Sequence, residues 1–167
     1  MMTVHRIHPV DHPMLRRKAS RLGRVTSDIR LFVEDMFETM AANQGLGLAA
    51  PQIGHPWRVI VLDADGESIA IVNPEIVRQS GSITADEGCL SLPNWFGPVT
   101  RSEVVTVKGS NVDGKEIRYR LRDLAARVVQ HEIDHLDGVI FTDRLTDPSL
   151  LRFVDPRSAE AQELHVS

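Results

Sequence analysis

Two histidines one helical turn apart carry the strongest chemical signal in the sequence. They belong to the run His131-Glu132-Ile133-Asp134-His135. Residues four apart lie on one face of a helix, so both imidazoles point the same way, and apolar residues earlier in the stretch continue that face toward the core. Glu132 is offset by about a third of a turn and can stand beside an ion held by the histidines without being its ligand. The pattern is typical of a metal-hydrolase helix, with two histidine ligands and a glutamate as general base.

The alternative is that these are ordinary helix residues, because the pattern fixes only three positions. A catalytic metal also needs a third protein ligand and an open position for water. Cys89 stands out among the candidates because it lies in a loop-like stretch, whereas a cysteine that merely fills the core more often sits in a periodic apolar run. The other candidates are His5, His8, His12, His55, His165 and several carboxylates.

A third stretch combines small residues with a single amide side chain. It runs from Gly45 through Gly47 to Gln52 and reads Gly-Leu-Gly-Leu-Ala-Ala-Pro-Gln. Glycines let a backbone approach a ligand closely, and the Gln52 amide can donate a hydrogen bond to an oxyanion. The alternative interpretation is a helix cap followed by a tight buried turn.

Two long helices flank the middle of the chain. Apolar residues recur at helical spacing over residues 27–43, and Gly45 follows as a stop. The second helix carries the histidine pair. We expect Asp123 to cap its start, and we expect it to run to about Leu136 and to stop at Gly138.

Strands dominate the region between these helices. The expected strands cover 57–62, 68–72 and 74–78, the alternating residues around Val105 and Val107, and a return strand from Ile117 to Leu121 after a hairpin turn at Asp113-Gly114. Residues 45–54 are expected to be neither helix nor strand, and 84–100, which hold two prolines, to be a loop. Short helical elements are expected near Leu15 and from Asp147-Pro148 to Pro156. The pattern predicts an α+β fold, with mostly antiparallel strands packed around a central metal-binding helix.

Length and charge limit the remaining possibilities. The 167 residues suit one catalytic domain over 1–167, with an irregular arm at about 1–25 and a short polar tail at about 156–167. A net charge of −4 argues against a direct nucleic-acid site. No apolar run approaches the roughly 20 residues of a membrane span. The first residues lack the apolar core of a signal peptide, so we expect a cytoplasmic protein.

Taken together, three stretches resemble those of the peptide deformylase family. The family carries a GxGLAAxQ stretch, an EGCLS stretch and a QHExDH stretch in this order. Here they are Gly45 to Gln52, Glu87 to Ser91 and Gln130 to His135, and every family-fixed position matches. The similarity covers about residues 7–146, which is nearly the whole chain.

The resemblance implies a residue set and a reaction. Cys89, His131 and His135 would hold one divalent metal ion, which in this family is usually Fe(II), with nickel, cobalt or zinc able to substitute. Glu132 would be the acid and base, and Gln52 with the backbone N–H of Leu90 would stabilise the oxyanion. The reaction implied is removal of the N-formyl group from the initiator methionine of nascent chains, with release of formate.

Substrate recognition follows from the same stretches. A formyl carbon carries only a hydrogen, so a tight wall beside it would admit formyl and exclude acetyl. The methionine side chain needs an apolar pocket, for which Leu46 and, on the histidine helix, Val128, Val129 and His131 are the candidates. The extended backbone of Gly45, Leu46 and Gly47 is expected to pair with the substrate peptide as an added strand.

Two further expectations concern the surroundings of the site. Arg101 is expected to pair with Glu87 and to brace the stretch around Cys89. Family members that dock on the ribosome resemble one another in a long basic C-terminal helix, whereas residues 147–167 here hold two basic residues against four acidic ones. We therefore expect at most a transient ribosome contact, and not one made by this tail.

Two other function classes share part of the pattern. A metallopeptidase would usually take its third ligand from downstream of the helix, whereas the best candidate here, Cys89, lies upstream. A non-catalytic metal-binding domain would have no use for Glu132 beside the metal or for Gln52 in the small-residue stretch. Turnover of a formyl-methionyl peptide against its acetyl analogue separates all three interpretations.

Overall fold

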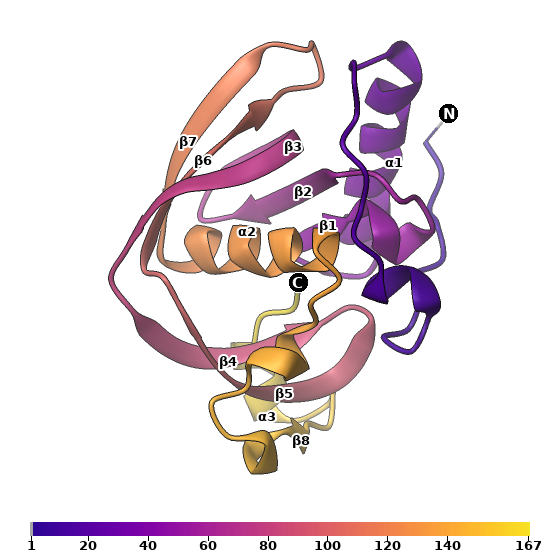
Figure 1. Cartoon of the computed structure of the whole chain (residues 1–167). Helices are drawn as coiled ribbons and strands as arrows, with labels where there is room; N and C mark the ends of the chain where they lie inside the picture. Colours follow the sequence, from indigo (N-terminus) through magenta and orange to yellow (C-terminus); the bar gives the residue numbers. More distant parts are fainter. Residues whose placement is uncertain (1) are drawn as a thin grey trace.

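In the computed structural model, which describes residues 2–167, two antiparallel sheets enclose a central helix. The larger sheet has the order β1-β2-β3-β6-β7 and the smaller one the order β4-β5-β8. Figure 1 shows helix α2 lying between the two sheets. The strands are β1 (Gly47–Ala49), β2 (Val59–Ala64), β3 (Glu67–Ser80), β4 (Ile83–Cys89), β5 (Leu92–Arg101), β6 (Val104–Ser110), β7 (Glu116–Arg122) and β8 (Arg152–Phe153). The helices are α1 (Ser27–Ala42), α2 (Asp123–Leu136) and α3 (Ala159–Glu163), with short 3₁₀ turns at Pro13–Arg16, Ala50–Ile53, Phe141–Arg144 and Pro148–Leu150. The predicted α+β class is confirmed.

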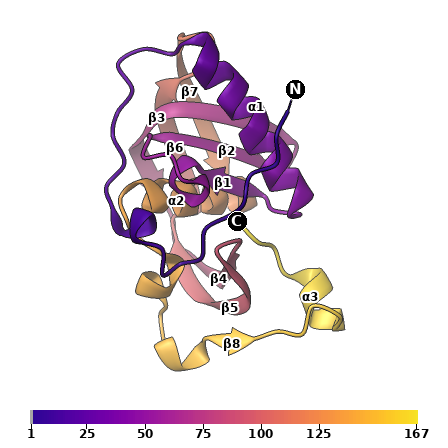
Figure 2. The ribbon, with the colours of Figure 1, turned by 90° about the vertical axis from the view of Figure 1, so that its right-hand side faces the viewer.

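Strand β2 shows how both faces of the larger sheet become buried. Val59 and Val61 pack in the cluster that contains the apolar face of α1, whereas Ile60 and Leu62 pack in the cluster that contains α2. Side chains alternate between the two faces of a strand, so a run of consecutive apolar residues is typical of a strand covered on both sides. Figure 2 shows α1 on one side of this sheet. The sheet and α1 thus form a rigid support behind α2.

The two long helices occur where they are predicted. Helix α1 begins at Ser27, and α2 ends at Leu136. Gly138, two residues later, has a φ of +74°. The predicted cap is wrong, because Asp123 itself has a φ of +50° and α2 has no side-chain cap from its own N-cap residue. The helix start is instead contacted by Asp65, from the β2–β3 turn, whose carboxylate accepts a hydrogen bond from the N–H of Ala125 at 3.3 Å.

The expected loop over residues 84–100 is wrong. These residues form β4 and β5, which pair from Ile83 with Arg101 to Cys89 with Leu92. Pro98 cannot donate a hydrogen bond to a neighbouring strand, but its carbonyl accepts one from the N–H of Thr146. A proline fits a strand where its missing N–H is not needed, so the prolines do not prevent this hairpin.

Three smaller expectations also need correction. Residues 45–54 are not wholly irregular, since Gly47–Ala49 pair with β2 and Ala50–Ile53 form a 3₁₀ turn. The strands expected at 68–72 and 74–78 are one strand, β3, with a register shift between Val72 and Glu75. The third helix expected from Asp147 is a single 3₁₀ turn that ends at Leu150, because the following residues pair with β5 as β8.

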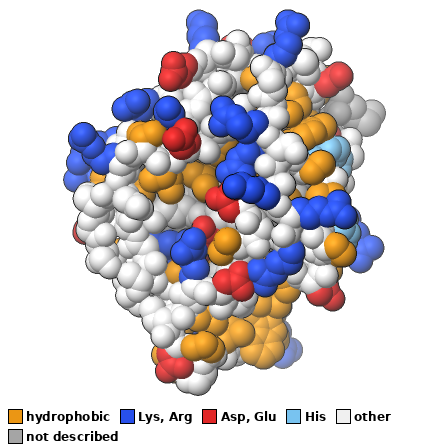
Figure 3. Space-filling view, viewed as in Figure 1, with side chains coloured by type: hydrophobic (Ala, Val, Ile, Leu, Met, Phe, Trp, Pro, Cys, Tyr) orange, Lys and Arg blue, Asp and Glu red, His pale blue; other side chains and the backbone are white. Residues whose placement is uncertain are grey.

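The surface mixes charged and apolar side chains. Figure 3 shows acidic and basic groups interspersed over one face, with hydrophobic side chains gathered at its lower end. The exposed large apolar residues include Trp95, Leu150 and Phe153. The rings of Trp95 and Phe153 pack edge to face, with their centroids 5.8 Å apart. Within residues 2–167, no helix combines the length and the apolar character that crossing a membrane requires.

Candidate metal centre

Helix α2 brings both histidines and Glu132 into the space between the sheets. All three side chains are buried, and Glu132 has no exposed surface. The ring centroids of His131 and His135 are 5.0 Å apart, as expected for residues one turn apart on the same face. The predicted inward orientation of the pair is confirmed.

Cys89 reaches the histidines from the last position of β4. Its Sγ atom lies 3.3 Å from Nε2 of His135, and one ligand atom from each of Cys89, His131 and His135 lies within 4.8 Å of the others. Ligands at zinc-like bond lengths of about 2.0–2.3 Å around one tetrahedral ion lie roughly 3.5 Å apart. Within residues 2–167, no other group of three such side chains is close enough to hold an ion. His5, His8, His12, His55 and His165 therefore do not complete this group.

Glu87 fixes the orientation of His131. Nδ1 of His131 lies 2.9 Å from a Glu87 oxygen, and Nε2 has no hydrogen-bond partner among the described residues, which leaves it available to an ion. Arg101 donates two hydrogen bonds to the same carboxylate, at 2.8 and 2.9 Å, which confirms the predicted pair. A carboxylate behind a histidine ligand is a common means of fixing its tautomer.

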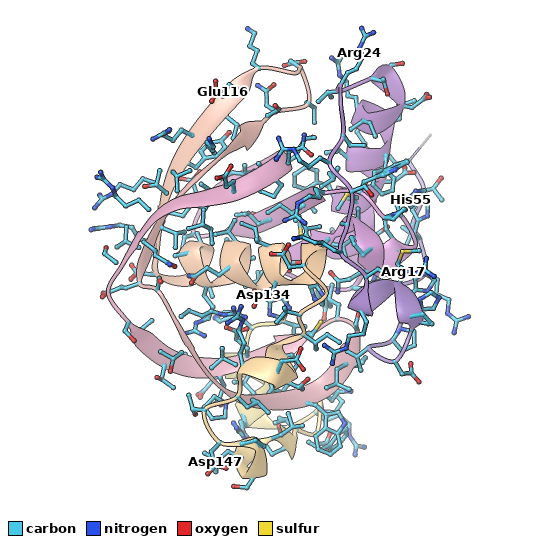
Figure 4. The ribbon with its side chains drawn as sticks, in the orientation of Figure 1. Arg17, Arg24, His55, Glu116, Asp134 and Asp147 are labelled. Atoms are coloured by element: carbon cyan, nitrogen blue, oxygen red, sulfur yellow. The ribbon has the colours of Figure 1, made fainter. Side chains whose placement is uncertain are left out.

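Asp134 extends this buried network to a second carboxylate. It lies on α2, and Figure 4 labels it on the side of the helix that faces the smaller sheet. Arg101 donates to it at 2.6 Å, and Arg144 forms a second ion pair with it. Burial alone would raise the pKa of Glu87, but its hydrogen bonds with Arg101 and His131 outweigh burial and hold that pKa well below its usual range. Glu87 is therefore charged at neutral pH.

Several buried atoms at the centre lack a partner. Among residues 2–167, no hydrogen bond reaches Nε2 of His131, either carboxylate oxygen of Glu132, or Nδ1 of His135. Unpaired polar atoms are costly to bury, so their concentration at one place indicates a site for an ion or a reacting molecule. The donor set of one thiolate and two imidazoles is one that divalent zinc, iron, nickel or cobalt accepts. The residues present thus fit the metal that the sequence predicts.

In the chain alone, burial disfavours the charged forms of these groups. Burial, followed by the charge of Glu132, raises the pKa of the Cys89 thiol to about 12. Burial, followed by the charge of Glu87, raises the pKa of Glu132 well above its usual value. Burial and the charge of His131 lower the pKa of His135. A cation at the centre would favour the thiolate and the carboxylate, since coordination deprotonates a thiol.

The comparisons with known proteins agree on one family. The polypeptide deformylase family model matches residues 4–150. A peptide deformylase of Thermomicrobium roseum is 45% identical over 171 residues, covering 97% of both chains. One from Desulforudis audaxviator is 46% identical, covering 87% of this chain and 96% of its own. The crystal structure of the Thermotoga maritima peptide deformylase superposes with a TM-score of 0.84 at 38% identity, covering 87% of this chain and 99% of that one.

The chain belongs to the peptide deformylase family. It is therefore a metal-dependent hydrolase that removes the N-formyl group from nascent chains. The metallopeptidase and the non-catalytic metal-binding domain, which the histidine motif alone leaves open, do not describe this deformylase.

In this deformylase, the small-residue stretch lies directly against Glu132. A Cβ atom on Gly47 would lie 2.6 Å from an oxygen of Glu132 and 2.7 Å from Cγ1 of Val128. A Cβ on Gly45 would lie 2.5 Å from Leu90. Gly47 is thus required by the close approach of β1 to α2 and not by a positive φ, whereas at Gly45 the added atom would meet only the end of the Leu90 side chain.

Gln52 lies at the edge of the same centre. It is fully buried, its Oε1 accepts a hydrogen bond from the N–H of Ala49 at 2.9 Å, and its Nε2 lies 3.7 Å from the Cys89 sulfur. Nε2 also donates to the hydroxyl of Ser91 at 3.1 Å, a contact that the sequence analysis missed. The oxygen is anchored in β1, so the amide N–H groups point toward the metal centre.

The remaining predicted residues divide between the cleft and the core. Leu46 is partly buried, and its N–H donates to the carbonyl of Val166 at 2.7 Å. The N–H of Leu90 donates to the carbonyl of Ser167 at 2.8 Å. Val128 and Val129 are both buried in the largest core cluster, and Val128 also faces Gly47. The structure therefore brings Leu46, Leu90 and Val128 to the site and places Val129 in the surrounding core.

Proposed function

We propose that Cys89, His131 and His135 hold one divalent ion, Fe(II), and that this centre removes the formyl group from initiator methionine, releasing formate. The proposal rests mainly on one observation, the unpaired Glu132 carboxylate beside a buried Cys-His-His group. When bound, the ion would act as a Lewis acid and would lower the pKa of water toward about 7. Nickel, cobalt and zinc accept the same donor set and are the alternatives to iron.

Glu132 moves the protons of the reaction in this proposal. Its carboxylate takes one proton from the attacking water, whose oxygen forms the new bond to the formyl carbon. It then delivers a proton to the amine nitrogen as the carbon–nitrogen bond breaks. Burial raises the pKa of Glu132, which favours a group that can carry the proton between the two steps.

Gln52 and the backbone N–H of Leu90 stabilise the developing oxyanion. Ala49 holds the Gln52 oxygen, so the nitrogen side of its amide is directed toward the Cys89 sulfur. The Leu90 N–H follows Cys89 directly and points into the cleft, where it contacts the carbonyl of Ser167. Donors held in place before the reaction need no reorganisation when the charge forms, and each is typically worth about 3 kcal/mol.

The substrate peptide lies along the extended residues Gly45, Leu46 and Gly47. On one side, Leu46 is hydrogen-bonded to β2, because its carbonyl accepts a hydrogen bond from the N–H of Asp63 at 2.8 Å. Its own N–H points the other way, toward the carbonyl of Val166. We propose that the methionine side chain packs against Leu46 and Val128. Val129 belongs to the same core cluster as Val128, but only Val128 contacts Gly47, so the pocket is assigned to Leu46 and Val128.

The proposal extends to the whole chain and its setting. Residues 1–167 act as one catalytic domain, because the N-terminal arm joins both sides of the site: the N–H of His8 donates to the Gln52 carbonyl and that of Val10 to the Ser91 carbonyl. The partners are N-formylmethionyl peptides of nascent chains, which places the enzyme in the cytoplasm. Contact with the ribosome is transient and does not use the tail, and we assign no direct nucleic-acid site and no membrane contact.

The choice of acyl group tests this function. The chain, purified without oxygen, should release formate from formyl-Met-Ala-Ser and act on acetyl-Met-Ala-Ser roughly 10- to 200-fold more slowly in kcat/KM, because the extra methyl group has no space beside the carbonyl. Elemental analysis of the same sample should find one metal ion per chain. Equal turnover of both peptides, or cleavage at internal peptide bonds, would contradict the proposal.

A Gln52→Leu variant tests the oxyanion role. Leucine keeps a similar bulk and removes the amide donor, so kcat should fall by roughly 10²- to 10³-fold while KM changes little. The measurement is steady-state kinetics on formyl-Met-Ala-Ser. A Ser91→Ala variant is the matched control, because it removes the hydroxyl partner of Gln52 and leaves the amide in place. A raised KM with intact kcat would show that Gln52 only holds the substrate.

A further inference from the structure

Residues 164–167 of this chain cross the open edges of both sheets. The N–H of Leu46, next to edge strand β1, donates to the carbonyl of Val166 at 2.7 Å. On the other side, Val166 forms a parallel bridge with Gly88 of edge strand β4, and the N–H of Leu90 donates to the carbonyl of Ser167 at 2.8 Å. Figure 2 shows this segment rising from α3 to a position between β1 and β4. The segment thus forms a short additional strand between the sheets.

The two amides that hold this segment are those that the proposed function requires. Leu46 offers its N–H to the substrate backbone, and Leu90 offers its N–H to the oxyanion. An N–H group makes one good hydrogen bond at a time, so residues 164–167 and a formylated peptide cannot use these donors together. The inference below therefore rests on the proposed function.

We propose that residues 164–167 are an intramolecular competitor that fills the peptide groove and leaves when a formylated peptide binds. The segment lies in the direction opposite to that of the substrate. Its carboxyl-terminal side reaches Leu90, whereas a substrate must present its formylated amino end there. Strand pairing accepts both directions, because the same backbone N–H and carbonyl groups serve parallel and antiparallel ladders.

Side chains of the segment add apolar contacts to this pairing. Leu164 and Val166 line a cavity together with Leu46, Leu90 and Phe96. Ser167 is buried, whereas His165, two residues earlier, is exposed. The backbone hydrogen bonds and the apolar side chains of Leu164 and Val166 together hold the segment in the groove.

The attachment of the segment is local and can open without unfolding the enzyme. Helix α3 before it has no buried residue, and Arg152 holds this region through ion pairs with Asp86 and Glu160 that are all at least partly exposed. Exposed ion pairs contribute little stability, so the cost of release is set mainly by the groove contacts. Because the segment is tethered, its competition with substrate does not depend on enzyme concentration.

Competition of this kind has a defined kinetic signature. If only the open fraction of the enzyme binds substrate, the apparent KM rises by the inverse of that fraction, whereas kcat at saturation is unchanged. A Val166→Asp variant replaces an apolar side chain that contacts this cavity with a charged one and should release the segment. Its KM for formyl-Met-Ala-Ser should be roughly three- to tenfold lower, with kcat unchanged. Gln162→Asp is the matched control, since it adds the same charge on an exposed position of α3 and should leave KM as it is.

Hydrogen exchange in the unmodified chain provides a readout independent of turnover. The N–H of Ser167, which contacts the Gly88 carbonyl at 3.4 Å, and that of Leu90 should be protected in the free enzyme. Saturating Met-Ala-Ser, the reaction product, should displace the segment and speed exchange at Ser167. The proposal would be overturned if Ser167 were unprotected in the free enzyme, or if adding Met-Ala-Ser left its exchange unchanged. It would also be overturned by a Val166→Asp variant in which Ser167 has lost protection but KM is unchanged. Absence of formate release from every form of the chain would instead contradict the proposed function.

Discussion

A Glu132→Gln variant is expected to fold and bind metal as the parent does, and to lose about 10²- to 10⁴-fold in kcat. Glutamine has almost the same shape as glutamate, so it fits the fully buried position beside Gly47. Its amide can hydrogen-bond to a water molecule but cannot take the proton from it. Because Glu132 is not one of the three grouped donors, the metal content should stay at one ion per chain.

The measurement combines steady-state kinetics on formyl-Met-Ala-Ser with elemental analysis of the same preparation. Glu67→Gln is the matched control, since it makes the same substitution at an exposed position at the start of β3 and should change neither quantity. A Glu132→Gln enzyme that keeps more than about a tenth of the parent rate would show that another group carries the proton.

The helices are the part of the fold that the sequence predicts best, and the reason is the helical spacing of their apolar residues. Helix α2 lies between two sheets, so every residue from Ala125 to Leu136 is buried, and Gly138 follows its end with a positive φ. Its capping could not be read from neighbouring residues, since the contact at Ala125 comes from Asp65, in a distant turn. Local patterns locate a helix, whereas distant contacts decide how its ends are satisfied.

The hairpin of β4 and β5 shows where local patterns fail. Pro93 and Pro98 are typical loop residues, and Asn94 has a φ of +71°, so the local signal is that of a turn. The strands form because the carbonyl of Pro98 accepts from Thr146 and because Glu87 and Arg101 pair between them. Cys89 therefore lies at the end of a strand and not in the predicted loop, although its position beside both histidines agrees with its prediction as their partner.

The surroundings of the site depend on contacts between residues far apart in the sequence. The pairing of Arg101 with Glu87 could be foreseen, but the contact of Glu87 with His131 and the hydrogen bond from Gln52 to Ser91 join different elements. The position of residues 164–167 has no local signal either, because short strand additions are made by backbone groups that every residue carries. Residue types thus identify the chemistry, and the fold determines which groups support it.

A Cys89→Ser variant should lose most of its metal and, with it, most of its deformylase activity. The serine hydroxyl is similar in size to the thiol, so the buried position at the end of β4 is kept, but the hydroxyl does not ionise as the thiol does on coordination. Replacing a residue that only supports a ligand typically weakens metal affinity by 10- to 100-fold, so loss of the ligand itself should cost at least about 100-fold. At that affinity, the variant should be largely metal-free after dialysis against a buffer without metal.

Elemental analysis and formate release, both on anaerobically prepared protein, measure the two effects of the Cys89 substitution. The Ser91→Ala variant serves here as the control, because it changes a buried residue two positions away and leaves the sulfur and both imidazoles in place. Circular dichroism should show the same secondary structure in parent, variant and control, since the buried ion pairs of Glu87 and Arg101 hold the β4–β5 hairpin without the sulfur. One bound ion per chain in a folded Cys89→Ser protein would exclude the thiolate from the ligand set, and the third ligand would have to be sought among the unpaired oxygens of Glu132.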